Sequence, residues 1–432
     1  MMANDAVRDA GSILPLHRGH ILGVAAFLML PLGFYTPKGL APLFIGTAIM
    51  ATVIDAIRRR RLPPIGGRLA VALSAFIAWA AASALWSVTP AHSLRAAAEV
   101  GATALAGLLL VAIARRLDGP ERDFAKRAVM TGGIVAFSAL AIEFLTDAGL
   151  FRSALKMVGL AVITPLPVLV DEVFKYGNLL AIAALFTWFW IIVIVRRGLH
   201  ILAVAFGLFV LGLFIRAEVE IPLMALGGGV AVFVAALLIP RFVKVALPAV
   251  LLIGALAAPL AISVLPPIDQ FVRTYPYLSP SAYSRVDIWL ATTGYINERP
   301  ILGYGMDGSR ALPGAQAKIL RSYPTVVGRL NWQTALEAVP LHPHNLFLQL
   351  WVELGVIGAF LGFVVLWALI REIASIPGRV DRALGYGMFA TGLAMGLASF
   401  GAWQSWWLSA LWLAGALAAA SFAGRPSDTP IH

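Results

Sequence analysis

The sequence predicts an all-α polytopic membrane protein with about 12 transmembrane helices, and three observations support this fold class. Hydrophobic residues make up 60% of the 432 residues, whereas charged residues make up only 13%. Soluble domains are about 45–50% apolar and about 25% charged, so a soluble globular protein and a disordered chain are both excluded. The apolar residues are also gathered in stretches long enough to cross about 30 Å of hydrocarbon as helices.

Twelve apolar stretches are candidates for crossing the membrane. Inside a bilayer the backbone must satisfy its own hydrogen bonds, so stretches of this length are expected to be helices. Their Gly and Pro content is ordinary for membrane helices and does not argue against spanning. The predicted spans are 20–36, 39–55, 68–86, 96–114, 127–146, 177–195, 199–215, 222–239, 243–264, 345–369, 383–400 and 403–422.

The spans divide the chain into three parts. Residues 1–264 hold helices 1–9 and an outer segment at 147–176, residues 265–341 form a loop domain between helices 9 and 10, and residues 342–432 hold helices 10–12 and a short tail. The middle of the outer segment, 157–170, is apolar but too short to cross, so it is expected to lie along the interface or to dip into it. Both long segments fall on one face, which predicts that the protein works at the outer membrane surface.

The distribution of positive charge predicts the orientation. With both termini in the cytoplasm, the inner segments carry 20 of the 33 Lys and Arg residues, the short outer segments carry six, and the loop domain carries seven. Long loops are left out of this comparison, so the orientation follows from 20 Lys and Arg residues in the inner segments against six in the short outer segments. The basic run Arg58–Arg61 is then a topogenic cluster beside a span, and no nucleic-acid partner is expected. Trp403, Trp406 and Trp407 are expected to form an interfacial belt at the outer end of the last span.

The sequence offers little for a metal or a cofactor. It contains no cysteine, which excludes disulfides, thiolate zinc sites and cysteine nucleophiles. His342 and His344 form a His-x-His pair, but no third ligand with convincing spacing lies nearby. We therefore expect neither a metal nor any other cofactor.

Three polar groups border the outer face. Arg216 lies in a very short turn between two spans, where it is held close to the membrane surface. Arg285 lies at the expected start of a helix in the loop domain, which continues to a Gly-rich turn at 299–305. His344 and Asn345 lie where the tenth span begins, and one of them is expected to be near its N-cap.

Helix polarity gives these groups a joint meaning. The eighth and tenth spans both run from outside to inside, so their positive N-terminal ends point to the outer face, just after Arg216 and His344. Free backbone N–H groups and guanidinium groups suit a phosphate. A histidine in a positive field stays neutral, and a neutral imidazole can accept a proton. The residues therefore predict a phosphate clamp beside a general base.

Each residue also has a structural explanation. Arg216 alone could bind lipid headgroups in a short outer loop. Arg285 alone could form a salt bridge within the loop domain, with Asp287 or Glu298. The two histidines could serve as a helix cap and a structural hydrogen bond.

The chain resembles a known family at these positions. The sequence HPHNLFLQLWVELGVIG at 342–358, together with twelve spans and one large outer loop between spans nine and ten, strongly resembles the O-antigen ligase and polymerase superfamily. Arg285 with Trp289, followed by PILGYG at 300–305, is similar to a second signature of that family, and the Arg216 turn is similar to a third. The architecture covers nearly the whole chain, but the specific motifs cover only about 40 residues.

One departure from the family pattern concerns that third motif. Many members place a small hydroxyl residue before the arginine and a glycine after it, whereas here Ile215 and Ala217 flank Arg216. The charge is kept while the local geometry differs, so the subfamily is less certain than the chemistry.

The resemblance implies a GT-C-like glycosyltransferase in the inner membrane of a Gram-negative bacterium, with a periplasmic active site. It would use an undecaprenyl-diphosphate-linked glycan as donor and lipid A–core as acceptor, among membrane lipids and without a metal. His344 would be the base that deprotonates the acceptor hydroxyl, and Arg216 and Arg285 would bind the donor diphosphate. His342 and Asn345 would support these residues or the substrate, and Asn178 resembles a further family position.

Three other functions compete with the ligase. The polymerase of the same superfamily joins repeat units that remain lipid-linked, and a related transferase glycosylates proteins. A transporter or flippase is a different class, for which charged residues near mid-span are typical. Glu143 and Glu353 are acidic candidates within spans, but Lys and Arg are absent there.

Overall fold

The computed structural model describes residues 17–146, 149–157, 176–216, 220–324 and 331–422. The helices are α1 (Arg18–Tyr35), α2 (Leu40–Arg59), α3 (Arg68–Ala82), α4 (Pro90–Ala114), α5 (Gly119–Leu145), α6 (Gly149–Met157), α8 (Tyr176–Arg196), α9 (His200–Arg216), α10 (Glu220–Leu238), α11 (Pro240–Ser263), α12 (Ile268–Thr274), α13 (Pro280–Glu298), α14 (Leu346–Ala374), α15 (Arg379–Ala398) and α16 (Ser405–Phe422). Three 3₁₀ helices, η1 (Pro37–Gly39), η2 (Ser83–Leu85) and η3 (Gly308–Ala311), and two strands, β1 (Lys318–Pro324) and β2 (Asn331–Glu337), complete the structure.

The predicted helical membrane architecture is confirmed in its main features. Each of the twelve apolar stretches forms a helix, and among the described residues ten helices are long and apolar enough to cross a membrane. The other two are α9, which has 17 residues, and α15, which begins with the charged residues Arg379, Asp381 and Arg382. The protein is therefore a multi-pass membrane protein, and the count of twelve spans stays a prediction.

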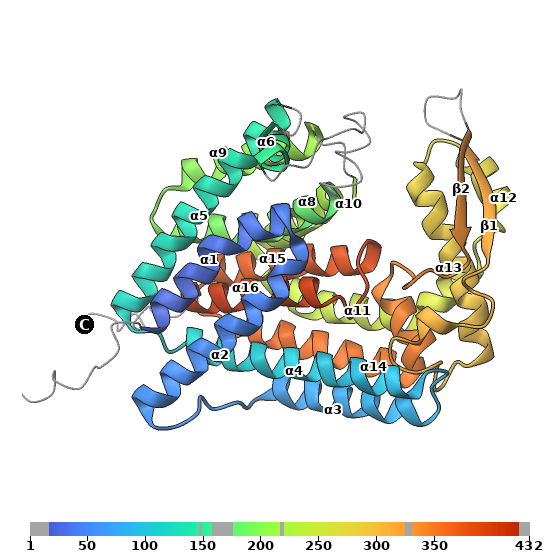
Figure 1. Cartoon of the computed structure of the whole chain (residues 1–432), viewed down its shortest axis with the longest axis horizontal. Coiled ribbons are helices and arrows are strands. Elements are labelled where there is room, and N and C mark those ends of the chain that lie inside the picture. The colour runs from blue at the N-terminus through green and yellow to red at the C-terminus, as the bar shows by residue number, and fades with distance from the viewer. Residues whose placement is uncertain (1–16, 147–148, 158–175, 217–219, 325–330, 423–432) are drawn as a thin grey trace, which may run out of the picture.

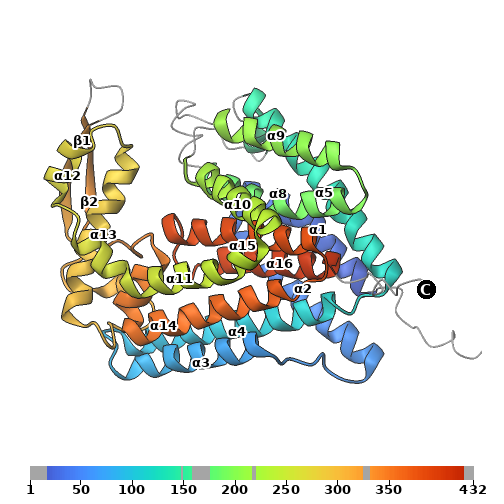
Figure 2. The ribbon, with the colours of Figure 1, turned by 180° about the vertical axis from the view of Figure 1, so that it is seen from behind.

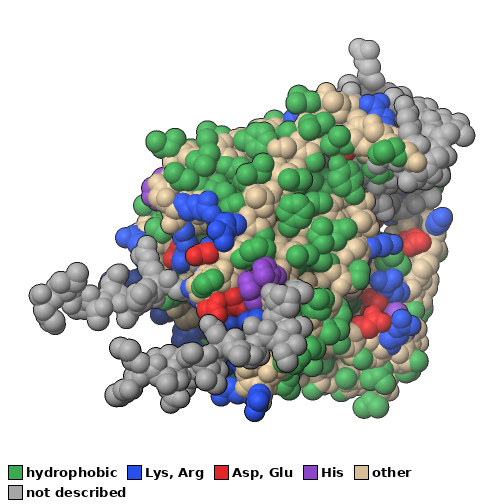
Figure 3. Space-filling view, turned by 60° about the vertical axis from the view of Figure 1, so that its left-hand side comes forward, with side chains coloured by type: hydrophobic (Ala, Val, Ile, Leu, Met, Phe, Trp, Pro, Cys, Tyr) green, Lys and Arg blue, Asp and Glu red, His purple; other side chains and the backbone are tan. Residues whose placement is uncertain are grey.

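The long helices run side by side as one bundle, and a smaller unit lies at one end of it. Figures 1 and 2 show α12, α13, β1 and β2 at this end from both sides. On the face drawn in Figure 3, charged side chains gather toward the two ends, and hydrophobic side chains cover much of the surface between them. This distribution suits a bundle whose middle lies in hydrocarbon.

Small residues bring neighbouring helices together in the bundle. A Cβ atom on Gly132 of α5 would lie only 2.7 Å from the Cα atom of Phe27 in α1, and one on Gly229 of α10 would lie 2.8 Å from the carbonyl oxygen of Gly387 in α15. Apolar burial gives little drive for association between helices in lipid, so close backbone contact of this kind is a main source of packing energy.

The ends of α1, α2 and α5 meet in a buried ionic cluster. Arg18 donates to Asp55 over 2.8 Å and to Glu121 over 2.6 Å, and all three side chains are buried. Arg59 donates to Asp55 over 3.1 Å, and Arg58 lies 3.7 Å from Glu121. Two exposed arginines of the basic run at 58–61 thus contact this buried cluster, and the topogenic role of the run stays a prediction.

The unit between α11 and α14 contains an antiparallel hairpin that the sequence analysis did not predict. Strand β1 pairs with β2 in a register that sets Lys318 opposite Glu337. The hairpin is joined to α13 by Asp287, which accepts from Arg321 over 2.7 Å and from the Tyr323 hydroxyl over 3.1 Å. Asp287 therefore pairs with the hairpin and not with Arg285.

The interfacial belt predicted for three tryptophans is wrong. Trp406 and Trp407 are buried in the bundle, where both pack against Phe400. The indole N–H of Trp403 donates to the buried carboxylate of Glu353 over 2.6 Å. These side chains lie near the end of a span in the sequence, but they face the protein interior and not the lipid.

Two predicted segments fall wholly or partly outside the described residues. Most of the outer segment 147–176 is not described, including nearly all of its apolar middle 157–170. The turn after Arg216 also lies outside the description at 217–219.

Candidate active site

Helix α14 is broken at Gly355, and the break positions the surrounding loops. Gly355 has φ 67° and ψ −170°, so the two halves of the helix do not share a continuous hydrogen-bond ladder. The Gly-rich turn at 300–305 fills the gap. The N–H groups of Tyr304 and Gly305 donate to the carbonyls of Val352 and Glu353 over 2.9 and 2.7 Å, and the N–H of Val356 donates to Pro300 over 2.9 Å.

These bonds unite two motifs that are about 40 residues apart in the sequence. Broken backbone at membrane depth must find partners within the protein, and the turn supplies them. Close approach requires glycine on both sides. A Cβ atom on Gly303 would lie 2.5 Å from the backbone of Glu353, and one on Gly355 would overlap the carbonyl of Ile301.

Glu353 ties the break to three other segments. Its fully buried carboxylate accepts from the backbone N–H of Asp307 over 2.7 Å, the hydroxyl of Ser309 over 2.7 Å, and the amide of Gln349 over 3.0 Å. Trp403 is the fourth donor. Glu143, the other acid within a span, accepts from Tyr35 and from two backbone N–H groups of α6. Both acids therefore have structural partners, which weakens the transporter hypothesis that rested on them.

The segment before α14 is ordered by its own polar groups. Asn345 is the N-cap, as predicted for this position, and its side-chain oxygen accepts from the N–H groups of Phe347 and Leu348 over 3.0 and 3.2 Å. This cap uses N–H groups that a phosphate at the helix N-terminus would need. The backbone anion site expected here is thus closed at these two N–H groups, and an anion must be bound mainly by side chains.

His344 is held so that, among the described residues, one of its ring nitrogens has no hydrogen-bond partner. Its Nδ1 atom lies 2.6 Å from the backbone oxygen of Ser399, just beyond the end of α15. A carbonyl only accepts, so Nδ1 carries the hydrogen and the neutral ring has its acceptor at Nε2. Burial lowers the pKa of His344, the nearby Arg285 charge lowers it further, and the bond to Ser399 opposes both effects. His344 is therefore a neutral imidazole with an unprotonated Nε2.

Arg285 is held by the same end of α15. Its Nε–H donates to the backbone oxygen of Ala398 over 2.8 Å, and Nη1 donates to the backbone oxygen of Ser281 over 2.9 Å and to the Ser281 hydroxyl. Within the described part of the chain, Nη2 has no hydrogen-bond partner. Burial lowers the pKa of Arg285, and the carboxylate of Glu220 opposes this shift. The ordinary pKa of a guanidinium group is so far above neutral pH that Arg285 stays charged.

His342 packs beneath His344 and orders it. The two rings are 4.3 Å apart, and the backbone N–H of His344 donates to Nδ1 of His342 over 3.3 Å. Nε2 of His342 lies 3.2 Å from the side-chain amide of Gln404. Burial, with the nearby His344 and the Arg310 charge, lowers the pKa of His342 to about 3. His342 is thus a neutral residue in contact with His344, and its supporting role stays a prediction.

Arg216 and Asn178 are not joined to this pair by any contact in the described residues. Arg216 is the last residue of α9 and its side chain is exposed. Four residues later, Glu220 begins α10 and accepts from the hydroxyl of Ser279, the N-cap of the helix that carries Arg285. Asn178 lies in the first turn of α8 and is partly buried. The roles of both residues stay predictions.

The structure thus unites Arg285 with His344 and adds partners that sequence reasoning missed. Two consecutive backbone carbonyls, of Ala398 and Ser399, hold the two side chains next to each other. Gln404 was also missed. A backbone carbonyl leaves no side-chain pattern in the sequence. The predicted span at 383–400 nevertheless places Ala398 and Ser399 at the outer face, where Arg285 and His344 were also expected. In the described residues, no cluster of three or more His, Cys, Asp or Glu side chains could hold a metal ion.

Comparison with known proteins places these residues in a family context. Residues 175–363 match the family model described as O-antigen ligase, and this range includes both Arg285 and His344. Curated relatives named "Putative polysaccharide ligase" occur in Rickettsia felis (27% identical over 342 residues, 78% of this chain and 77% of the relative) and in Rickettsia typhi (26% over 339 residues, with the same coverage). A third, from Rickettsia conorii, is 26% identical over 340 residues, 78% of this chain and 76% of the relative. The chain is thus similar to the O-antigen ligase family over residues 175–363, and to these polysaccharide ligases over 78% of its length.

Proposed function

We propose that the protein is an O-antigen ligase. It transfers O-antigen polysaccharide from undecaprenyl diphosphate to a sugar hydroxyl of the lipid A–core oligosaccharide, in lipopolysaccharide biosynthesis. One observation carries the proposal: the end of α15 holds a neutral imidazole and a guanidinium side by side, each with a nitrogen free for substrate. A base next to a fixed positive charge is what a transfer that releases a diphosphate requires.

The first step is removal of a proton from the acceptor. Nε2 of His344 accepts the hydroxyl proton as the oxygen attacks the anomeric carbon of the donor. A bond forms from that oxygen to the carbon, and the bond from the carbon to the diphosphate oxygen breaks on the opposite side. The electron pair leaves with the diphosphate, so the configuration at the anomeric carbon is inverted.

Arg285 stabilises the charge that develops on the leaving diphosphate. Its Nη2 has no hydrogen-bond partner in the described residues and its other nitrogens are anchored, so it is proposed to bind the oxyanion with little reorganisation. Arg216 is proposed as the second cation. The bond from Ser279 to Glu220 joins the start of α10, four residues after Arg216, to the start of α13 and supports this role. Two arginines would supply the charge that a divalent metal supplies in many transferases, so the reaction is proposed to be metal-independent.

The cellular setting is part of the same proposal. The excess of Lys and Arg in the predicted inner segments supports cytoplasmic termini and a periplasmic active site in the inner membrane of a Gram-negative bacterium. A GT-C-like architecture, with chemistry at one end of a helical bundle, is consistent with the site at the end of α15. The donor and the acceptor are both lipid-linked, so a site at a membrane face meets both.

The test is reconstitution of the full-length protein in liposomes. Undecaprenyl-diphosphate-linked polysaccharide is supplied with either lipid A–core or a second lipid-linked repeat unit. The names of the relatives favour ligation, so extension of lipid A–core is expected. Extension of the lipid-linked unit instead would identify a polymerase and overturn the ligase proposal, and a glycosylated protein acceptor would point to an O-oligosaccharyltransferase.

Variants of His344 and Arg285, with a control at His200, test the residues within that assay. His344→Ala should lose transfer by about 10²–10⁴-fold, whereas His200→Ala, which changes an exposed histidine at the start of α9, should keep it. Arg285→Lys should restore little of the activity lost in Arg285→Ala, because the single ammonium nitrogen of lysine lacks the planar spread of nitrogens that lets a guanidinium reach the carbonyl and a phosphate at once. Full transfer by His344→Ala would remove this residue as the base.

A further inference from the structure

A groove lies between α3 and α14, away from the candidate active site. Its volume is about 750 Å³, within the range of about 300–1,000 Å³ for small-molecule sites. Arg68 begins α3, and Arg371 lies in the last turn of α14. The opposite ends of these two helices lie near the candidate active site, because α14 begins at the N-cap Asn345 and α3 ends beside the loop at Met306. The groove therefore opens at the end of the bundle opposite His344.

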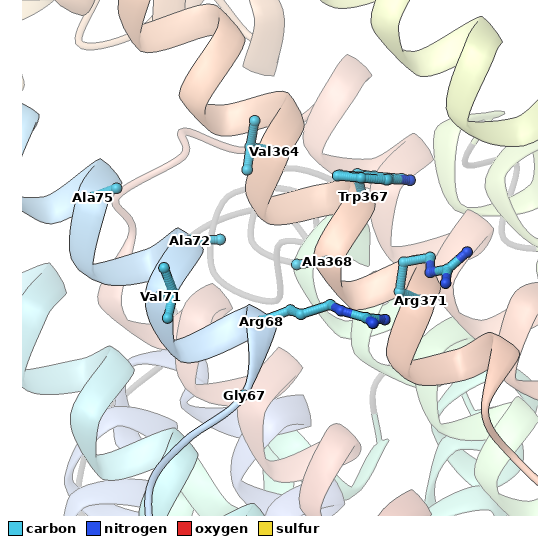
Figure 4. A pocket seen from close by; sticks show the side chains of 9 residues that line it. All are labelled: Gly67, Arg68, Val71, Ala72, Ala75, Val364, Trp367, Ala368 and Arg371. Carbon is cyan, nitrogen blue, oxygen red and sulfur yellow. The ribbon is translucent and has the colours of Figure 1, made fainter.

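The floor of the groove is apolar because small side chains face each other there. Ala72 and Ala75 of α3 oppose Ala368 of α14, and the larger Val71 and Trp367 border them (Figure 4). Val71 is 70% exposed and Trp367 is 45% exposed. Exposed apolar side chains on a span face hydrocarbon, so the groove is an indentation in the surface that contacts acyl chains.

The positive charges of Arg68 and Arg371 lie at the cytoplasmic end of this apolar surface. Figure 4 shows the side chain of Arg68 extending from α3 toward α14, beside Arg371. No carboxylate in the described residues bonds either guanidinium. The nearest acid in the sequence, Glu372, accepts from Arg115 over 3.0 Å instead. Two like charges that converge without a counter-ion favour an anion between them.

We propose that this groove binds one anionic phospholipid of the leaflet opposite the candidate active site. Its phosphate lies between Arg68 and Arg371, and an acyl chain covers the alanine floor. Guanidinium groups bind phosphate oxygens through paired N–H bonds, and basic pockets between helices at this depth bind anionic headgroups. Charge complementarity selects an anionic lipid over a zwitterionic one, whose own ammonium group would meet the two arginines.

The test measures lipid retention by the full-length protein in detergent, by native mass spectrometry. Palmitoyl-oleoyl phosphatidylglycerol is compared with the phosphatidylcholine of the same chains. The anionic lipid should be retained about 25-fold more tightly, at about fivefold for each arginine. Equal retention of the two lipids by the unchanged protein would overturn the proposal without any variant.

Three variants locate the bound lipid. Arg68→Gln with Arg371→Gln should abolish the preference, whereas Arg241→Gln with Lys244→Gln, which removes two exposed charges from the same end of the bundle, should keep it. Ala75→Trp keeps both arginines but fills the groove, and it should release the lipid. Retention in Ala75→Trp, or displacement of the lipid by equimolar glycerol 3-phosphate, would show that the groove does not hold an acyl chain and would overturn the proposal.

Discussion

The break in α14 predicts a severe and specific effect for Gly355→Ala. The backbone of Gly355 has φ 67° and ψ −170°, a region that residues with a Cβ atom essentially do not occupy. The new methyl group would also overlap the Ile301 carbonyl and lie 2.7 Å from the nitrogen of Leu302. These backbone atoms lie between Pro300, whose carbonyl accepts from Val356, and Tyr304, whose N–H donates to Val352, so they cannot move aside without disturbing the contacts across the gap.

The magnitude follows from two contributions. Forcing a Cβ atom into this backbone region costs about 1–3 kcal/mol, and overpacking a tight contact costs a further 1–3 kcal/mol or so. The free energy of unfolding should therefore fall by about 2–6 kcal/mol, a large part of the roughly 5–15 kcal/mol of a typical protein. Unfolding by SDS in mixed micelles, followed by tryptophan fluorescence, measures the change.

A matched glycine separates the break from glycine loss in general. Gly228 lies in the regular helix α10, and a Cβ atom there would meet nothing within 4 Å. Gly228→Ala should be neutral or slightly stabilising, because alanine is the better helix former. Equal stability of Gly355→Ala and Gly228→Ala would refute the account of a broken helix held by the 300–305 turn.

Three further outcomes are expected. Burial and the Arg285 charge lower the pKa of His344 below its usual 6.5. The midpoint of the acid side of the kcat/KM profile should therefore lie below pH 6.5. Arg285→Gln removes the positive charge that disfavours the imidazolium, so it should move that limb to higher pH, and an unmoved limb would contradict the proximity of the two groups. Glu353→Ala leaves four buried donors without their acceptor and should cost about 3 kcal/mol or more in SDS unfolding, whereas Glu372→Ala should cost less than about 1 kcal/mol because its ion pair is at the surface. Transfer should continue in EDTA, and a loss that a divalent cation reverses would argue for metal chemistry.

Hydropathy predicted where helices lie but not all of their bounds. The second span was expected at 39–55 and α2 runs to Arg59, because the charged end of a helix lies outside the hydrocarbon that hydropathy detects. Helix α5 begins at Gly119, eight residues before the predicted start at 127. Its charged first turns carry a capping box of Asp118 and Glu121, a local signal that marks the true start. The hairpin at 318–337 was missed because its strands are short and rich in polar residues.

The site was predicted in part, for reasons that differ between its residues. Residue type and position placed either His344 or Asn345 near the N-cap of α14, and the structure identifies Asn345 as the cap. The pairing of Arg285 with His344 depended on the family resemblance, because 59 positions separate them in the sequence. Their anchors are backbone carbonyls, which any residue provides and no motif records. The tryptophans were misplaced because position near the end of a span does not distinguish the side facing lipid from the side facing neighbouring helices.

The end of α15 has a mechanical consequence for the site. Arg285 and His344 are each hydrogen-bonded to one of two consecutive peptide carbonyls at the same helix end, so their mutual spacing is tied to that helix end as well as to the two segments that carry them. A tilt of α15, whose other end is anchored by the pair of Arg196 and Asp381, displaces both groups in concert. In the proposed transfer reaction, such a motion would change the reach of both groups toward a bound sugar together while preserving their separation.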